Sequence, residues 1–182
     1  LAKAGCDLNQ ADKDGVTPVL IAAQEGHTAA LKILVKARGC DLNHAMENGL
    51  TPAFVAAQGG HTAALKVLVE AGCDVNHQGR MRREPSDEGR YDTGLRRCSA
   101  GPHGRFEDPR HADEDGSTPA FIAAFECQTA ALELLVEAGC DVNQARKDGQ
   151  TPALVAAWQG HTAALELLLV AGCNVDQAAE GG

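Results

Sequence analysis

Residues 49–76 read GLTPAFVAAQGGHTAALKVLVEAGCDVN, and this stretch contains the signals for two short helices. Thr51 is a good N-cap, and Pro52 falls at the first helical position, where its missing N–H costs nothing. The Gly-Gly pair that follows predicts the end of this helix, because glycine tolerates the left-handed conformation of a C-cap. Thr62 is expected to cap a second helix over residues 63–71, which has an apolar stripe at i, i+3 and i+4. The stretch therefore predicts a helix-turn-helix unit.

This unit recurs along the chain with a period near 33 residues. Its Thr-Pro pair appears four times, at spacings of 34, 67 and 33 residues. The first spacing is one residue longer than the last because that unit contains one extra residue, Arg38. Such a period is typical of solenoids, in which short helices are stabilised by stacking on their neighbours. We therefore predict an all-α solenoid of stacked helix-turn-helix units with finger-like turns, interrupted in the middle. The four pairs begin at Thr17, Thr51, Thr118 and Thr151.

These units resemble the ankyrin repeat over about residues 1–77 and 112–177. The last unit carries the matching motifs Asp148-Gly149-Gln150-Thr151-Pro152, Ala156-Ala157, Gly160-His161, Leu165-Leu167-Leu168 and Gly172-Cys173-Asn174-Val175-Asp176. The resemblance implies a protein-binding solenoid whose partners contact the finger tips and the exposed side of the first helices, called the concave face.

The chain departs from the ankyrin pattern at two positions. Apolar residues replace the family's His after the Thr-Pro pair, which implies apolar packing in place of a hydrogen bond. In the third intact repeat Cys127-Gln128 replaces Gly-His, and we expect that turn to be distorted. The apolar replacements are Leu20, Phe54, Phe121 and Leu154.

Composition excludes several classes of function. The 182 residues carry a net charge of −9 and only six aromatic side chains, so a layered enzyme domain is not expected. Residues 79–111 alone hold eight Arg and six acidic residues, which leaves −11 for the rest of the chain. An acidic chain argues against nucleic acid and anionic membranes as partners. With no long apolar run, no initial Met and no signal-peptide pattern, the chain is interpreted as a fragment of an intracellular protein, cytoplasmic or nuclear.

Residues 78–111 lack apolar periodicity and are expected to be irregular or disordered. When the codons from Arg90 to His111 are shifted forward by one base, degeneracy permits the reading GTTPAFVAAQQGHTAALKILV, which is the repeat pattern again. We therefore hypothesise that this segment is a fifth repeat in a wrong frame, through a frameshift or a wrongly assigned splice boundary. We therefore predict four regions. Residues 1–77 hold a partial repeat plus two intact repeats, 78–111 form the irregular segment, 112–177 hold two intact repeats, and 178–182 form a tail. Because about three repeats are needed for stability, each half should be marginal unless the two dock on each other.

Five of the seven cysteines, and the three histidines of the Gly-His pairs, recur at whole-repeat spacing, which is too wide for a shared zinc site or a good disulfide. We expect the cysteines that follow each helix pair to be small packing residues and the histidines of Gly-His to stabilise turns. Cys98 lies in the misframed segment, Cys127 lies in a turn, and no motif supports a Cys-His nucleophile. No catalytic, cofactor or metal site is therefore expected. The recurrent residues are Cys6, Cys40, Cys73, Cys140 and Cys173, and His27, His61 and His161.

The candidate partner-binding residues are those that vary on the face implied by the resemblance. At the end of the first helix, Gln24 and Gln58 are replaced by Phe125 and Trp158 in the later repeats. Two aromatics one layer apart form a candidate hot spot, although packing on neighbouring repeats is the equal alternative. The finger tips Asp12-Lys13-Asp14, Met46-Glu47-Asn48, Asp113-Glu114-Asp115 and Arg146-Lys147-Asp148 also vary, which adds Lys13, Glu47, Glu114 and Lys147.

The sequence therefore predicts a non-enzymatic protein-interaction module without a small-molecule substrate. Its mostly acidic finger tips favour a partner with basic features. Two alternatives remain open. One is a targeting or regulatory region of a longer enzyme or channel, and the other is a decayed or wrongly assigned gene segment without a stable folded product.

Overall fold

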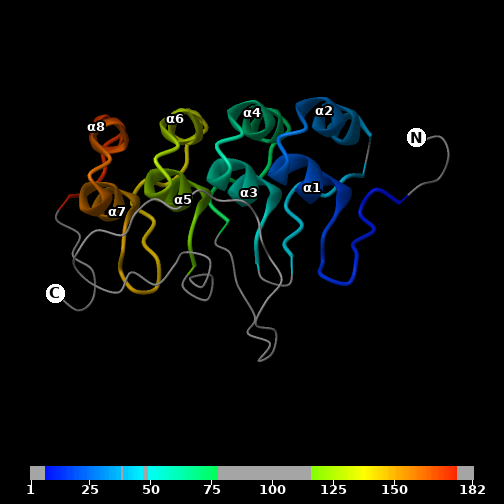
Figure 1. The fold of residues 1–182 in the computed structure, drawn as a ribbon, viewed down its shortest axis with the longest axis horizontal. Coiled ribbons are helices and arrows are strands. Elements are labelled where there is room, and N and C mark those ends of the chain that lie inside the picture. Colours follow the sequence, from blue (N-terminus) through cyan, green and yellow to red (C-terminus); the bar gives the residue numbers. More distant parts are fainter. Residues whose placement is uncertain (1–6, 38, 47–48, 78–115, 176–182) are drawn as a thin grey trace.

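The computed structural model describes residues 7–37, 39–46, 49–77 and 116–175. In these ranges the chain forms eight α-helices and no β-strand, in four helix-turn-helix units. The first helices of the units lie in one row and the second helices in a parallel row, while the connecting turns project from the side of the first row (Figure 1). The helices are α1 Pro18–Gln24, α2 Thr28–Lys36, α3 Pro52–Gln58, α4 Thr62–Glu70, α5 Pro119–Phe125, α6 Thr129–Glu137, α7 Pro152–Gln159 and α8 Thr162–Val170.

Each first helix begins at a threonine cap, as predicted. Thr51 Oγ1 accepts the backbone N–H of Phe54 at 3.3 Å, and Pro52 is the first helical residue. The other three caps have the same geometry, with oxygen–nitrogen distances of 3.1 to 3.4 Å. Thr-Pro is therefore the local signal that sets where every unit starts. The remaining pairs are Thr17 with Leu20, Thr118 with Phe121 and Thr151 with Leu154.

The start of the second helix differs from the prediction by one residue. Thr62 is not the cap but the first residue of α4, and His61 is the cap, without a side-chain capping hydrogen bond. The Thr62 hydroxyl instead donates to the carbonyl oxygen of Gly60 at 3.3 Å. The threonine therefore ties the helix start back to the turn, and α4 covers 62–70 where 63–71 was expected.

The turn at Cys127 keeps the course of the other turns, so the expected distortion is wrong. Gln128 N–H donates to the carbonyl of Ala123 at 2.8 Å, as His61 N–H donates to Ala56 at 2.9 Å in the second unit. Cys127 has a φ of 58° where Gly60 has 66°. The backbone hydrogen bonds of the turn and the helices on either side of it therefore hold a cysteine in a conformation that favours glycine.

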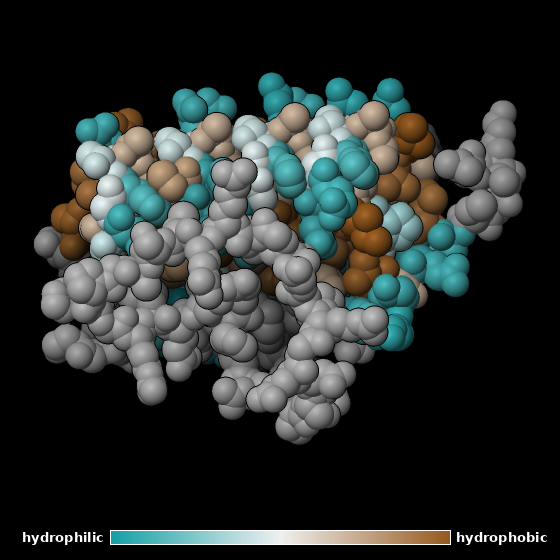
Figure 2. All heavy atoms as spheres, viewed as in Figure 1, coloured by the Kyte–Doolittle hydropathy of each residue, from teal (hydrophilic) through white to brown (hydrophobic). Residues whose placement is uncertain are grey.

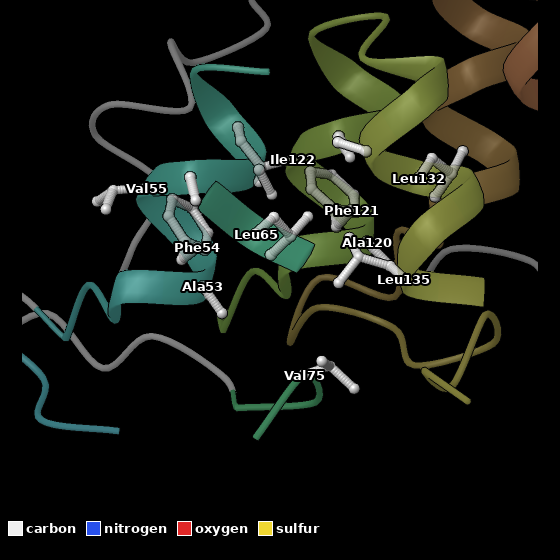
Figure 3. Close-up of a cluster of buried hydrophobic side chains, with 14 of the residues drawn as sticks. Ala53, Phe54, Val55, Leu65, Val75, Ala120, Phe121, Ile122, Leu132 and Leu135 are labelled. Carbon is white, nitrogen blue, oxygen red and sulfur yellow. The ribbon is translucent and has the colours of Figure 1, made fainter. Parts of the chain in front are cut away.

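The core is one cluster of small and medium apolar side chains that runs through all four units. Phe54 of α3 and Phe121 of α5 are buried in it, which confirms that apolar residues pack at the position of the family's histidine. Figure 3 shows side chains of α3 and α4, among them Leu65, beside Phe121 and Ile122 of α5. Buried alanines fill the remaining space between helices, which explains how the core forms with so few aromatics.

The units before and after residues 78–115 pack directly on each other. Helix α3 contacts α5 and α4 contacts α6, as α1 contacts α3 and α2 contacts α4. Asn76 Oδ1 accepts the backbone N–H of Asp141 at 2.7 Å across 65 residues, with the same geometry as Asn43 and Asp74 in consecutive units. The two halves therefore dock, and the described residues form one array. The segment 78–111 and the tail 178–182 lie outside the described residues.

Candidate functional site

The candidate binding surface is the side of the array that carries the first helices and the fingers, and we call it the finger face. Gln24, Gln58, Phe125 and Trp158 occupy equivalent positions near the ends of α1, α3, α5 and α7, so they follow one another along this side. The Trp158 side chain is 58% exposed. Phe125 is half-buried and packs against the core, whereas Gln24 is exposed and Gln58 is half-buried. The row therefore ends in a large exposed aromatic.

The first and fourth fingers, whose tips the structure describes, are tight hairpin turns that project from the side of the first helices (Figure 1). In the first finger Asp12 N–H donates to the carbonyl of Val16 at 3.1 Å, and Gly15 has a φ of 77°, which only glycine adopts readily. The second and fourth fingers repeat this pattern around Met46 and Arg146, with distances of 3.0 and 2.9 Å. The tips of the first and fourth fingers are therefore held in place by their own backbone hydrogen bonds.

Of the four finger residues predicted to bind a partner, the structure describes two. Lys13 and Lys147 are exposed, each near the tip of its finger. Glu47 and Glu114 lie outside the described residues, so the structure places neither of them. The described part of the chain thus contributes two lysines, from the first and last fingers, to the finger face.

Arg146, at the fourth finger tip, is buried, unlike its neighbour Lys147. Its side chain is 7% exposed, and its guanidinium lies over the Phe121 ring, 5.0 Å from the centroid. Asp148 Oδ2 lies 3.7 Å from Arg146 Nη1, which balances the charge locally. Arg146 therefore joins the last finger to α5 of the preceding unit through a cation–π contact. In the sequence, the only sign of this contact is the aromatic residue Phe121. Its pairing with Arg146 depends on how the two units pack on each other.

The cysteines of the described residues are free thiols, and the four that follow the helix pairs are half-buried. Burial, with a smaller contribution from the Asp74 carboxylate, raises the pKa of Cys73 to about 11. Burial and Asp141 raise the pKa of Cys140 to about 11 in the same way. Both are therefore thiols at neutral pH, which makes them weak nucleophiles and weak metal ligands. Cys6 and Cys98 lie outside the described residues.

The Gly-His turns hold neighbouring units together. His161 Nδ1 donates to the carbonyl oxygen of Ala124 in the preceding unit at 3.0 Å. A Cβ on Gly26 would lie only 2.7 Å from Nδ1 of His61, so this histidine packs closely on the preceding turn. Across the described ranges, no group of three or more His, Cys, Asp or Glu side chains is arranged to hold a metal ion.

This geometry defines a class of protein: a helical solenoid whose side chains stabilise the stacking of units and whose variable residues lie on one side. A family model described as ankyrin repeats (3 copies) matches residues 1–79 and 98–179. The chain therefore belongs to the ankyrin-repeat family, whose members are generally protein-interaction modules and typically not enzymes. No curated protein matches the chain. No helix in the described residues is long and apolar enough to cross a membrane.

Proposed function

We propose that this chain binds a protein partner through the finger face, with Trp158 as the main anchor. The observation that carries the proposal is the 58% exposure of a tryptophan that follows Gln24, Gln58 and Phe125 along the array. A large exposed aromatic on an ordered helix loses little conformational entropy on binding, and tryptophan is enriched among binding hot spots.

The surroundings of Trp158 support this role. Phe125, at the equivalent position one unit earlier, packs against the core. Lys13 and Lys147 are exposed on fingers that their own hydrogen bonds hold in place. We infer that the apolar anchor supplies most of the affinity, while the variable fingers and the glutamines of the row, with Glu47 and Glu114, select the partner. The acidic residues of the tips, such as Asp12 and Asp14, favour a partner with basic side chains.

The test compares the wild type with two variants by cross-linking and affinity capture, with identification of the captured proteins by mass spectrometry. Trp158→Ala should lose the partners bound by the wild type, by at least tenfold in recovered amount, because removal of a hot spot costs more than about 2 kcal/mol. The melting temperature should stay within a few degrees, because most of the removed side chain faces solvent.

Val170→Ala is the matched control. Val170 is 91% exposed, but it lies at the end of α8, in the row of second helices. This variant should keep the partners of the wild type. If Trp158→Ala unfolds the chain, or if both variants bind as the wild type does, the anchor role of Trp158 is wrong.

A further inference from the structure

The outer surface of the second helices has an uneven distribution of charge. Each second helix has nine residues, and the fifth position is exposed in all four. Because the helices lie side by side in one row (Figure 1), these four side chains form a stripe along the array. Hydrophilic residues follow the upper edge of the space-filling view, above the second helices (Figure 2). In order along the array they are Lys32, Lys66, Glu133 and Glu166.

The stripe is therefore positive over α2 and α4 and negative over α6 and α8. Lys36 adds to the positive end and Glu137 to the negative end, and both are exposed. The four stripe residues form no ion pair with other parts of the described chain, so their charges are available to a partner. The exposed residues one turn earlier are small in every unit, which allows another surface to approach closely. They are Ala29, Ala63, Ala130 and Ala163.

We propose that two copies of this chain associate back to back through the outer surfaces of their second helices, in antiparallel order. A two-fold axis that runs parallel to the helices, midway between α4 and α6, reverses the order of the helices in the second copy. Helix α2 of one copy then faces α8 of the other, and α4 faces α6. Such an interface is self-complementary, as a symmetric dimer requires.

The charge pattern fits this axis. Lys32 of one copy meets Glu166 of the other, and Lys66 meets Glu133, and each pair occurs twice by symmetry. The alternative axis, parallel to the array, would place each lysine of one copy against the same lysine of the other. Repulsion between these like charges disfavours it. Exposed ion pairs are individually weak and are screened by salt, so the dimer is weak and salt-sensitive. The same axis brings Glu70 close to Glu137, which weakens the dimer further.

The experiment measures association of the full chain by sedimentation velocity, with circular dichroism to check that each variant is folded. At low ionic strength, where the Debye length is about 30 Å, the wild type should form dimers, and near 1 M salt, where it is about 3 Å, the dimers should dissociate. Lys32→Glu with Lys66→Glu makes the stripe wholly acidic and should weaken dimerisation by about tenfold or more. Glu133→Lys with Glu166→Lys makes it wholly basic and should have the same effect.

Mixing the two double variants supplies the decisive result. Their stripes are opposite in charge along the whole length, so the mixture should form heterodimers that are tighter than the wild-type dimer. Lys13→Glu with Lys147→Glu makes the same change in net charge on the fingers and should leave dimerisation unchanged. Glu70→Lys should strengthen the dimer several-fold. A wild type that stays monomeric at low salt, or a dimer that the stripe variants do not weaken, overturns the proposal.

Discussion

Cys127 shows how packing overrides the preference of a single residue. It is the one non-glycine residue with positive φ in the described part of the chain, and it occupies the place of Gly26, Gly60 and Gly160 in the other turns. A Cβ in this conformation costs about 1–2 kcal/mol, because it approaches the neighbouring carbonyl oxygen. The turn nevertheless forms, since its backbone hydrogen bonds and the helices on either side determine its course.

Replacing Cys127 with glycine should therefore stabilise the chain. We expect Cys127→Gly to raise the free energy of unfolding by about 1 kcal/mol, measured by urea denaturation. Cys127→Ala keeps the Cβ and removes only the thiol, so it should leave stability nearly unchanged. An equal gain in both variants would assign the effect to the thiol, and no gain in either would show that the conformation carries no cost.

At the scale of elements, Asn43, Asn76 and Asn143 each connect one helix pair to the next, and Asn9 makes the same contact from the segment before α1. Asn9, Asn43, Asn76 and Asn143 accept a backbone N–H from the following unit, with oxygen–nitrogen distances of 2.6 to 2.7 Å. This repeated hydrogen bond keeps the units in one register. Because Asn76 makes it with Asp141, α4 and α6 pack on each other in the same way as the second helices of consecutive units.

The contact of Asn76 can be tested against an internal standard. Asn76→Ala should lower the free energy of unfolding by about 1 kcal/mol, the net value of one hydrogen bond, and Asn43→Ala should have a similar effect. Urea denaturation of both variants gives the comparison. A loss for Asn43→Ala without one for Asn76→Ala would mean that the two halves do not dock in solution.

For the whole molecule, the decisive feature is that four units form one array despite the long segment between the second and the third. If residues 78–111 are removed, His77 joins Ala112 and the chain reads Asn-His-Ala-Asp-Glu-Asp-Gly. This has the length and pattern of the finger at residues 43–49, Asn-His-Ala-Met-Glu-Asn-Gly. The segment is thus one whole repeat in length, as expected if it derives from a repeat.

Deletion of residues 78–111 should keep a single cooperative thermal transition and raise stability by about 1–2 kcal/mol, because each halving of a loop gains about 0.6 kcal/mol. Residues 112–182 alone should show no cooperative transition, because α5 and α6 lose the packing of α3 and α4. Circular dichroism melts of both chains check this. A sharp melt of the short fragment would show that two units suffice, and loss of folding in the deletion variant would show that the segment is needed.

The sequence by itself determined the helix pairs, their period and their threonine caps, because these signals act within one repeat of about 33 residues. Through its resemblance to ankyrin repeats it also predicted a binding face, and the positions that vary on that face, such as Gln24 and Trp158, are the candidate binding residues. Only the tertiary structure decided that α3 packs on α5, that Arg146 is buried against Phe121 and that Cys127 keeps the turn intact. Those outcomes depend on contacts between units, where the packing of several side chains outweighs the preference of any single residue.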